Sequence, residues 1–179
     1  MSEAFGLWFG GSHMGFGTHM PILAAAVLGA RPGPVLEYGM GLYSSPLLHM
    51  LCEEQGRDLL SLDGDPPWAE RFDGLRAGPR HTVVGVEDWD LSEPFVDEWL
   101  HGRDPAVVFI DHGPDERRVV DARRVAHLAE LVLVHDWGQP PLPSQVELAS
   151  MFQYQWTSRV GPFTCVLSNV RPFVMPGLQ

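Results

Sequence analysis

The stretch from Pro34 to Ser45 constrains the fold of this chain more than any other. It reads PVLEYGMGLYSS, a short apolar run followed by two glycines one residue apart and by serines that open a helical pattern. Glycine has no Cβ, so its backbone can approach a ligand closely, and the first turn of a helix offers unpaired N–H groups to oxygen-rich ligands. This order of strand, tight turn and helix is typical of nucleotide-like cofactor sites in doubly wound α/β folds.

The rest of the chain alternates strand-like and helical segments, which predicts parallel βαβ units. We expect parallel strands over residues 35–38, 58–62, 81–86, 106–110 and 131–134. We expect helices over residues 19–30, 45–55, 66–76, 92–101, 115–129 and 144–151, with Thr18 and Ser92 as N-caps of the first and fourth. Residues 153–160 and 163–169 flank Gly161-Pro162 and predict a closing antiparallel hairpin. Residues 18–179 should form one domain, and residues 1–17, which are rich in glycine and aromatic side chains, could act as a lid.

Composition excludes several classes of function. The 179 residues carry 12 basic and 23 acidic side chains, a net charge of −11. General binding to nucleic acid or to anionic membranes needs cationic surface, so neither is expected. The sequence has no apolar run of about 20 residues and no signal-type N-terminus, which favours a cytoplasmic location. We leave open whether the protein forms a homo-oligomer.

The exits of the expected parallel strands carry a concentration of acidic, histidine and tryptophan side chains. Ligands of open α/β sheets bind at these carboxyl ends. The exits are Glu37 with Gly39–Leu42, Asp63-Gly64-Asp65, Glu87-Asp88-Trp89, Asp111-His112 and His135-Asp136-Trp137. Their positions predict one ligand site along one edge of the sheet.

Three of these exits suggest which cofactor the site takes. Asp63 lies about 20 residues beyond the glycine turn, where a carboxylate can accept hydrogen bonds from both hydroxyls of a ribose. Asp88 and Trp89 could meet the exocyclic amine and the ring of a base. Glu37 places a carboxylate beside the first turn, which would repel a pyrophosphate but suits an ammonium and a sulfonium. Charge therefore favours S-adenosylmethionine over NAD.

The motif Glu37-x-Gly39-x-Gly41, Asp63, Asp88-Trp89 and the closing hairpin resemble a class I S-adenosylmethionine-dependent methyltransferase over residues 18–170. This resemblance implies a Rossmann-like, doubly wound sheet of seven strands in the order 3-2-1-4-5-7-6, with strand 7 antiparallel and helices on both faces. The runs 107–111 and 131–136 resemble the small O-methyltransferase-like subgroup. We therefore expect methyl transfer to a small-molecule acceptor, at an oxygen atom. The cofactor-binding residues are predicted to be Glu37, Gly39, Met40, Gly41, Asp63, Gly64, Asp88, Trp89 and Asp111.

Catalysis is predicted to involve Asp111, His112 and His135, which lie at the carboxyl ends of two neighbouring strands. In one hypothesis, Asp111 and Asp136 hold a divalent metal ion that binds a substrate hydroxylate. In the other, which we favour, no metal is present and His112 or His135 removes the proton. His13 and His19 could join the site from the N-terminal region.

Two other functions remain compatible with the sequence. A methyltransferase-like fold without catalytic activity could bind a cofactor or a protein partner, and the compact length with no inserted substrate domain favours such a module. A nicotinamide-dependent enzyme would share the glycine turn, but Glu37 and the terminal hairpin argue against it.

Overall fold

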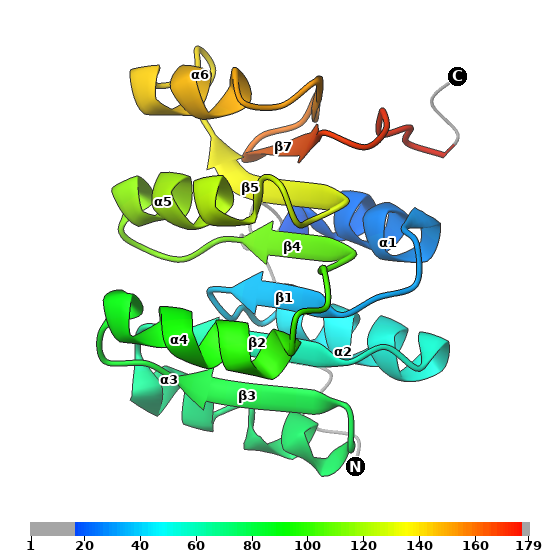
Figure 1. Cartoon of the computed structure of the whole chain (residues 1–179), viewed down its shortest axis with the longest axis vertical. Helices are drawn as coiled ribbons and strands as arrows, with labels where there is room; N and C mark the ends of the chain where they lie inside the picture. Colours follow the sequence, from blue (N-terminus) through cyan, green and yellow to red (C-terminus); the bar gives the residue numbers. More distant parts are fainter. Residues whose placement is uncertain (1–16, 177–179) are drawn as a thin grey trace.

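The computed structural model describes residues 17–176, which form one seven-stranded mixed sheet with helices on both faces (Figure 1). The strand order is β3-β2-β1-β4-β5-β7-β6. The strands are β1 (Val35–Tyr38), β2 (Leu59–Asp63), β3 (His81–Gly85), β4 (Val107–Ile110), β5 (Leu131–Trp137), β6 (Tyr154–Thr157) and β7 (Phe163–Ser168). The Rossmann-like fold and the strand order predicted from the sequence are confirmed. The predicted lid lies outside the described residues, apart from Gly17.

The sheet joins a parallel part to an antiparallel edge. β1 pairs in parallel with β2 and with β4, and β4 pairs in parallel with β5. β7 runs antiparallel to both β5 and β6 (Figure 1). All four residues of β1 and of β4 are buried, as expected for central strands that helices cover on both faces.

The helices divide between the two faces of the sheet. They are α1 (Met20–Gly29), α2 (Ser44–Gln55), α3 (Pro66–Glu70), α4 (Trp89–Leu100), α5 (Asp115–Val125) and α6 (Pro143–Ala149), with a 3-10 turn, η2, at Asp73–Ala77. α1, α2 and α3 cover one face, and α4, α5 and α6 cover the other (Figure 1). None of the helices within residues 17–176 is long and apolar enough to span a bilayer.

Several predicted boundaries and one predicted cap were wrong, and hydrogen bonds explain one boundary and the cap. α4 begins at Trp89 rather than at residue 92, because Asp88 caps it by accepting a hydrogen bond from the Asp90 N–H. α1 has no side-chain cap, since the Thr18 hydroxyl donates instead to the carbonyl of Pro162. α5 ends at Val125, and the predicted helix over 66–76 divides into α3 and η2.

β5 is longer than predicted, and the extension shapes the candidate site. The prediction ended this strand at Val134, but pairing of Trp137 with Phe163 of β7 carries it three residues further. The register shifts between Val134 and Trp137, and Asp136 within this irregularity has a φ of +53°. Bulges of this kind re-aim side chains and occur often beside functional sites.

Candidate functional site

The glycine turn joins β1 to α2 and lies directly against the end of β4. Gly39 has a φ of +91°, and a Cβ built on it would lie 2.5 Å from the backbone nitrogen of His112. Only glycine satisfies both the backbone conformation and this close approach. The turn is also held from β2, since the Gly39 N–H donates to the carbonyl of Leu62 at 2.8 Å. The sequence-predicted turn is therefore a fixed junction of three strand ends.

Asp63, at the end of β2, lies beside the same turn. Its Oδ2 accepts a hydrogen bond from the Met40 N–H at 2.7 Å, and its Oδ1 accepts one from the Asp65 N–H at 2.9 Å. Partial burial raises the pKa of Asp63 above its ordinary value, while the two N–H donors oppose the rise. The carboxylate is half-buried, and each oxygen keeps a second lone pair for a hydroxyl donor.

Glu37 lies beneath the turn rather than at its surface. The side chain is fully buried, and its two oxygens accept hydrogen bonds from Ser45 Oγ at 3.0 Å and Ser61 Oγ at 2.5 Å. Ser45 Oγ in turn accepts from the Gly41 N–H. Burial raises the pKa of Glu37 to about 7, although the serine hydroxyls oppose this. Glu37 therefore supports the turn through Ser45, and direct contact with a cofactor ammonium stays a prediction.

The polar chain below Glu37 continues to two histidines. Ser61 Oγ lies 2.9 Å from His81 Nε2, and His81 Nδ1 lies 3.1 Å from His49 Nδ1. Because the Ser61 hydroxyl donates to Glu37, its contact with His81 requires a proton on His81 Nε2. Burial, together with the neighbouring His49, lowers the pKa of His81 to about 4. This network fixes the carboxyl of Glu37 from below.

Trp89 and Gly64 pack against each other at the exits of β3 and β2. A Cβ on Gly64 would lie 3.0 Å from Trp89 Nε1, so the indole covers this glycine directly. The indole also contacts the imidazole of His112, with ring centroids 4.3 Å apart. Asp88 is exposed and caps α4. The predicted base-binding residues thus flank Asp63, and their contact with a base stays a prediction.

The structure separates His112 from Asp111, which precedes it. Successive side chains of an extended strand point to opposite faces of the sheet. His112 Nε2 lies 2.8 Å from Asp121 Oδ2 on the α5 side, and both side chains are buried. Burial alone would raise the pKa of Asp121, but hydrogen bonds from His112 and Arg117 hold it below its ordinary value. His112 is therefore bound to Asp121 beneath α5, away from the group around Asp111.

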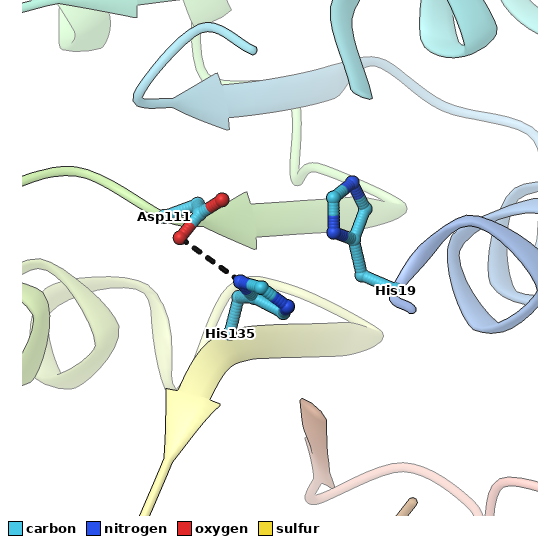
Figure 2. A group of neighbouring side chains, drawn as sticks. All are labelled: His19, Asp111 and His135. Atoms are coloured by element: carbon cyan, nitrogen blue, oxygen red, sulfur yellow. Dashed lines mark hydrogen bonds and ion pairs between the residues drawn. The ribbon is translucent and has the colours of Figure 1, made fainter. Parts of the chain in front are cut away.

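Asp111 instead lies with His135 and His19 on the α1 side of the sheet (Figure 2). Asp111 Oδ1 lies 3.2 Å from His135 Nδ1. The His19 ring lies edge-on to the His135 ring, with centroids 4.7 Å apart. Burial, with the neighbouring His135, lowers the pKa of His19 to about 4. Of the N-terminal candidates, His19 thus joins the site, while His13 lies outside the described residues.

An arginine occupies the space between the two predicted metal ligands. The Arg118 guanidinium lies 3.5 Å from Asp111 Oδ1 and 3.2 Å from Asp136 Oδ2. Asp136 is half-exposed, and its Oδ1 also lies 3.5 Å from His135 Nδ1. The guanidinium lies between the two carboxylates, in the position that a metal ion shared by Asp111 and Asp136 would need.

Arg118, Asp121 and Thr18 contact site residues but were not among the residues predicted for the site. Arg118 and Asp121 lie on α5, which packs over the ends of β4 and β5, and a charged face on that helix was the available signal. Thr18 was interpreted as a helix cap, whereas its hydroxyl lies 3.4 Å from His135 Nε2. That contact joins residues 117 positions apart and left no local signal.

Comparisons with known proteins show which fold this is. Cofactor-bound Rv0187 from MTB matches with a TM-score of 0.59 and 19% identity, over 86% of this chain and 80% of that one. Sp1610 of Streptococcus pneumoniae, a putative tRNA (m1A22) methyltransferase in complex with S-adenosyl-L-methionine, matches with a TM-score of 0.51 and 13% identity, over 87% and 74%. This chain has the fold of class I S-adenosylmethionine-dependent methyltransferases.

The other comparisons do not assign the chain to a particular family within this fold. A DUF574 family protein from Streptomyces avermitilis MA-4680 matches with a TM-score of 0.52 and 17% identity, over 83% of this chain and 80% of that one. No family model matches the chain, and a search of curated proteins finds no match. The small O-methyltransferase-like subgroup therefore stays a prediction.

Proposed function

We propose that this chain binds S-adenosylmethionine and transfers its methyl group to a small-molecule acceptor, at an oxygen atom. The observation that carries the proposal is the antiparallel β7, inserted between β5 and β6. Sheets that bind dinucleotides have six parallel strands in the order 3-2-1-4-5-6. The inserted strand favours a methyltransferase over a nicotinamide-dependent enzyme, and S-adenosylmethionine is bound by the structurally similar Sp1610.

The residues at the strand exits fit this cofactor. Asp63 offers a half-buried carboxylate whose free lone pairs suit the two ribose hydroxyls. The Gly39–Gly41 turn lies beside the start of α2 and Gly41 is partly exposed, so the polar end of the ligand could approach the turn at that residue. The Trp89 indole covers Gly64 next to Asp63 and forms an aromatic border that suits a purine. We assign the base to this border and the ribose to Asp63.

The acceptor is assigned to the space beside Asp111 and His135. Bound S-adenosylmethionine supplies an electrophilic methyl group, so the chain must position a nucleophile and manage its proton. Asp111 follows β4, the strand beside β1, and His135 lies on β5. These groups could take the acceptor proton directly or hold a metal ion that lowers the acceptor pKa. The contact of His112 with Asp121 on the opposite face supports giving this role to Asp111 and His135 rather than to His112.

The charge of the chain favours a small acceptor. Sp1610 is described as a putative tRNA methyltransferase, so this fold by itself does not choose between RNA and small molecules. The net charge of −11 disfavours a polyanion, because nucleic-acid binding draws on cationic contacts to phosphates. Within the described site, Arg118 is already paired with Asp111 and Asp136.

Calorimetry tests cofactor binding. The full chain should bind S-adenosylhomocysteine and should not bind NAD. Asp63→Asn should weaken S-adenosylhomocysteine about 10- to 100-fold, because hydrogen bonds to a charged group contribute about 1.5–3 kcal/mol. Asp104→Asn is the matched control, since Asp104 is exposed in the loop that precedes β4, away from the strand exits. Binding of NAD, or equal affinity in Asp63→Asn and the wild type, would contradict the cofactor assignment.

A methyl-transfer assay separates an enzyme from a non-catalytic module. Radiolabelled S-adenosylmethionine is incubated with panels of phenols, carboxylates, amines and RNA. We expect transfer to a hydroxyl or carboxylate compound and none to RNA. Retained cofactor binding without transfer to any panel would favour a cofactor-binding or partner-binding module instead.

A further inference from the structure

We propose that His19, Asp111 and His135 form a binding site for one divalent transition-metal ion, such as Zn²⁺ or Co²⁺. The three side chains converge from the start of α1, the end of β4 and the extended part of β5 (Figure 2). One ligand atom from each lies within 4.8 Å of the other two. This set differs from the pair Asp111 and Asp136 that the sequence predicted, because both histidines replace Asp136.

His19 gives the first argument for a bound ion. Its side chain is buried, with 3% of the residue exposed, and neither ring nitrogen has a hydrogen-bond partner among the described residues. A buried polar group without a partner costs about 1–3 kcal/mol. A metal ion bound to one nitrogen would satisfy the lone pair. The ring already lies beside His135, so its free nitrogen needs only a short movement to join the other ligands.

The protons around His135 give the second argument. The Thr18 hydroxyl donates to the carbonyl of Pro162 at 2.7 Å, so its contact with His135 Nε2 at 3.4 Å requires the proton on that nitrogen. His135 Nδ1 then turns a lone pair toward Asp111 Oδ1, 3.2 Å away. In a neutral His135 ring these two atoms are both acceptors, and either a proton or a metal ion between them would relieve their repulsion. Thr18 thus holds His135 in the tautomer that a metal ligand needs.

The distances suit coordination. Two ligands that lie about 2.0–2.1 Å from one ion are about 3 Å apart at angles of 90–110°, which matches the 3.2 Å between His135 Nδ1 and Asp111 Oδ1. His19, at up to 4.8 Å, needs a side-chain shift of about 1–2 Å to reach the same ion. A small rotation of His19 would therefore complete the site.

The ligand set selects the kind of metal. Imidazole nitrogen suits zinc, copper, iron and nickel, whereas magnesium and calcium prefer oxygen ligands alone. Three protein ligands leave coordination positions open, as in catalytic zinc sites. Arg118 lies 3.5 Å from Asp111, but its charge is shared with Asp136 and Asp115. An open coordination position beside Asp111 would receive the oxygen atom of the methyl acceptor. This last role rests on the proposed function, whereas metal binding does not.

Metal titration of the untagged full chain tests the site without any cofactor. After chelator treatment and buffer exchange, Co²⁺ is added and its visible absorption is followed, with calorimetry for Zn²⁺ and Mg²⁺. We expect one Co²⁺ or Zn²⁺ per chain, d–d bands of a site with nitrogen ligands, and no comparable Mg²⁺ binding. His19→Gln and His135→Gln should each weaken the transition metal at least about tenfold, since even outer partners of metal ligands contribute 10–100-fold.

His127→Gln is the matched control, because His127 is exposed at the end of α5. His19→Asn is made in parallel and circular dichroism is recorded for every variant, so that one unfolded variant does not remove the test. Absence of stoichiometric Co²⁺ and Zn²⁺ binding, or binding that His19 and His135 variants leave unchanged, overturns the proposal. Neither result bears on the proposed function, which the cofactor calorimetry tests separately.

Discussion

Replacing Glu37 by glutamine tests how the buried carboxyl supports the glycine turn. Glu37 is fully buried and accepts hydrogen bonds from Ser45 and Ser61. Glutamine has nearly the same shape, and its amide can accept from Ser45 and donate to Ser61. If His81 moves its ring proton from Nε2 to Nδ1, which faces His49 Nδ1, the Ser61 hydroxyl can then donate to His81 Nε2, 2.9 Å away. The substitution therefore removes a titrating group and leaves each neighbour with a partner.

The size of the effect follows from the pKa of Glu37. Burial raises this pKa from 4.5 to about 7 in the folded chain. A carboxyl whose pKa is raised on folding stabilises the fold at pH values below its unfolded pKa, and the contribution is lost as the pH rises through the folded pKa. For these two values, the loss between pH 5 and pH 8 is about 2–3 kcal/mol.

Urea denaturation, followed by circular dichroism from pH 5 to pH 8, measures this difference. The free energy of unfolding of the wild type minus that of Glu37→Gln should fall by about 2–3 kcal/mol across the range. Glu54→Gln, at an exposed position of α2, serves as the control. His19 remains in all three proteins, so its own titration cancels to first order. Parallel stability profiles for the wild type and Glu37→Gln would refute the raised pKa.

Three further substitutions test the packing around the site by urea denaturation. Gly39→Ala should destabilise the fold by about 2–4 kcal/mol, since φ is +91° and the new Cβ would meet the His112 backbone at 2.5 Å; a loss under about 1 kcal/mol would contradict the geometry. Asp121→Ala should cost about 3 kcal/mol, because it removes a partner from His112 and Arg117. Tyr38→Phe should be neutral or stabilising by up to about 1 kcal/mol, since the buried hydroxyl has no hydrogen-bond partner among residues 17–176.

Local patterns were enough to predict the order of elements and the edge that carries the site. Apolar runs such as 107–110 and 131–134 mark buried strands, and the glycine turn marks the junction of β1 and α2. These signals depend on residues within a few positions of one another. The parallel arrangement then places Asp63, Asp88 and Asp111 at one edge of the sheet, whatever the details of packing.

Only the tertiary structure decided which of these residues meet. His112 and Asp111 are adjacent in sequence, yet the pleat sends them to opposite faces, toward Asp121 and His135 respectively. That separation could have been predicted from strand alternation. The arrival of His19 beside His135 could not, because it depends on how α1 packs on β4 and on an extension of β5 that pairs with β7.

The sequence by itself thus determined the fold and the row of polar strand exits, since both arise from short-range periodicity and turn chemistry. The tertiary structure decided the depth of Glu37, the placement of Arg118 between two aspartates, and the grouping of His19 with Asp111 and His135. Each of these depends on contacts between segments far apart in the chain. Such contacts are set by packing of helices on the sheet, which the spacing of residues along the chain does not encode.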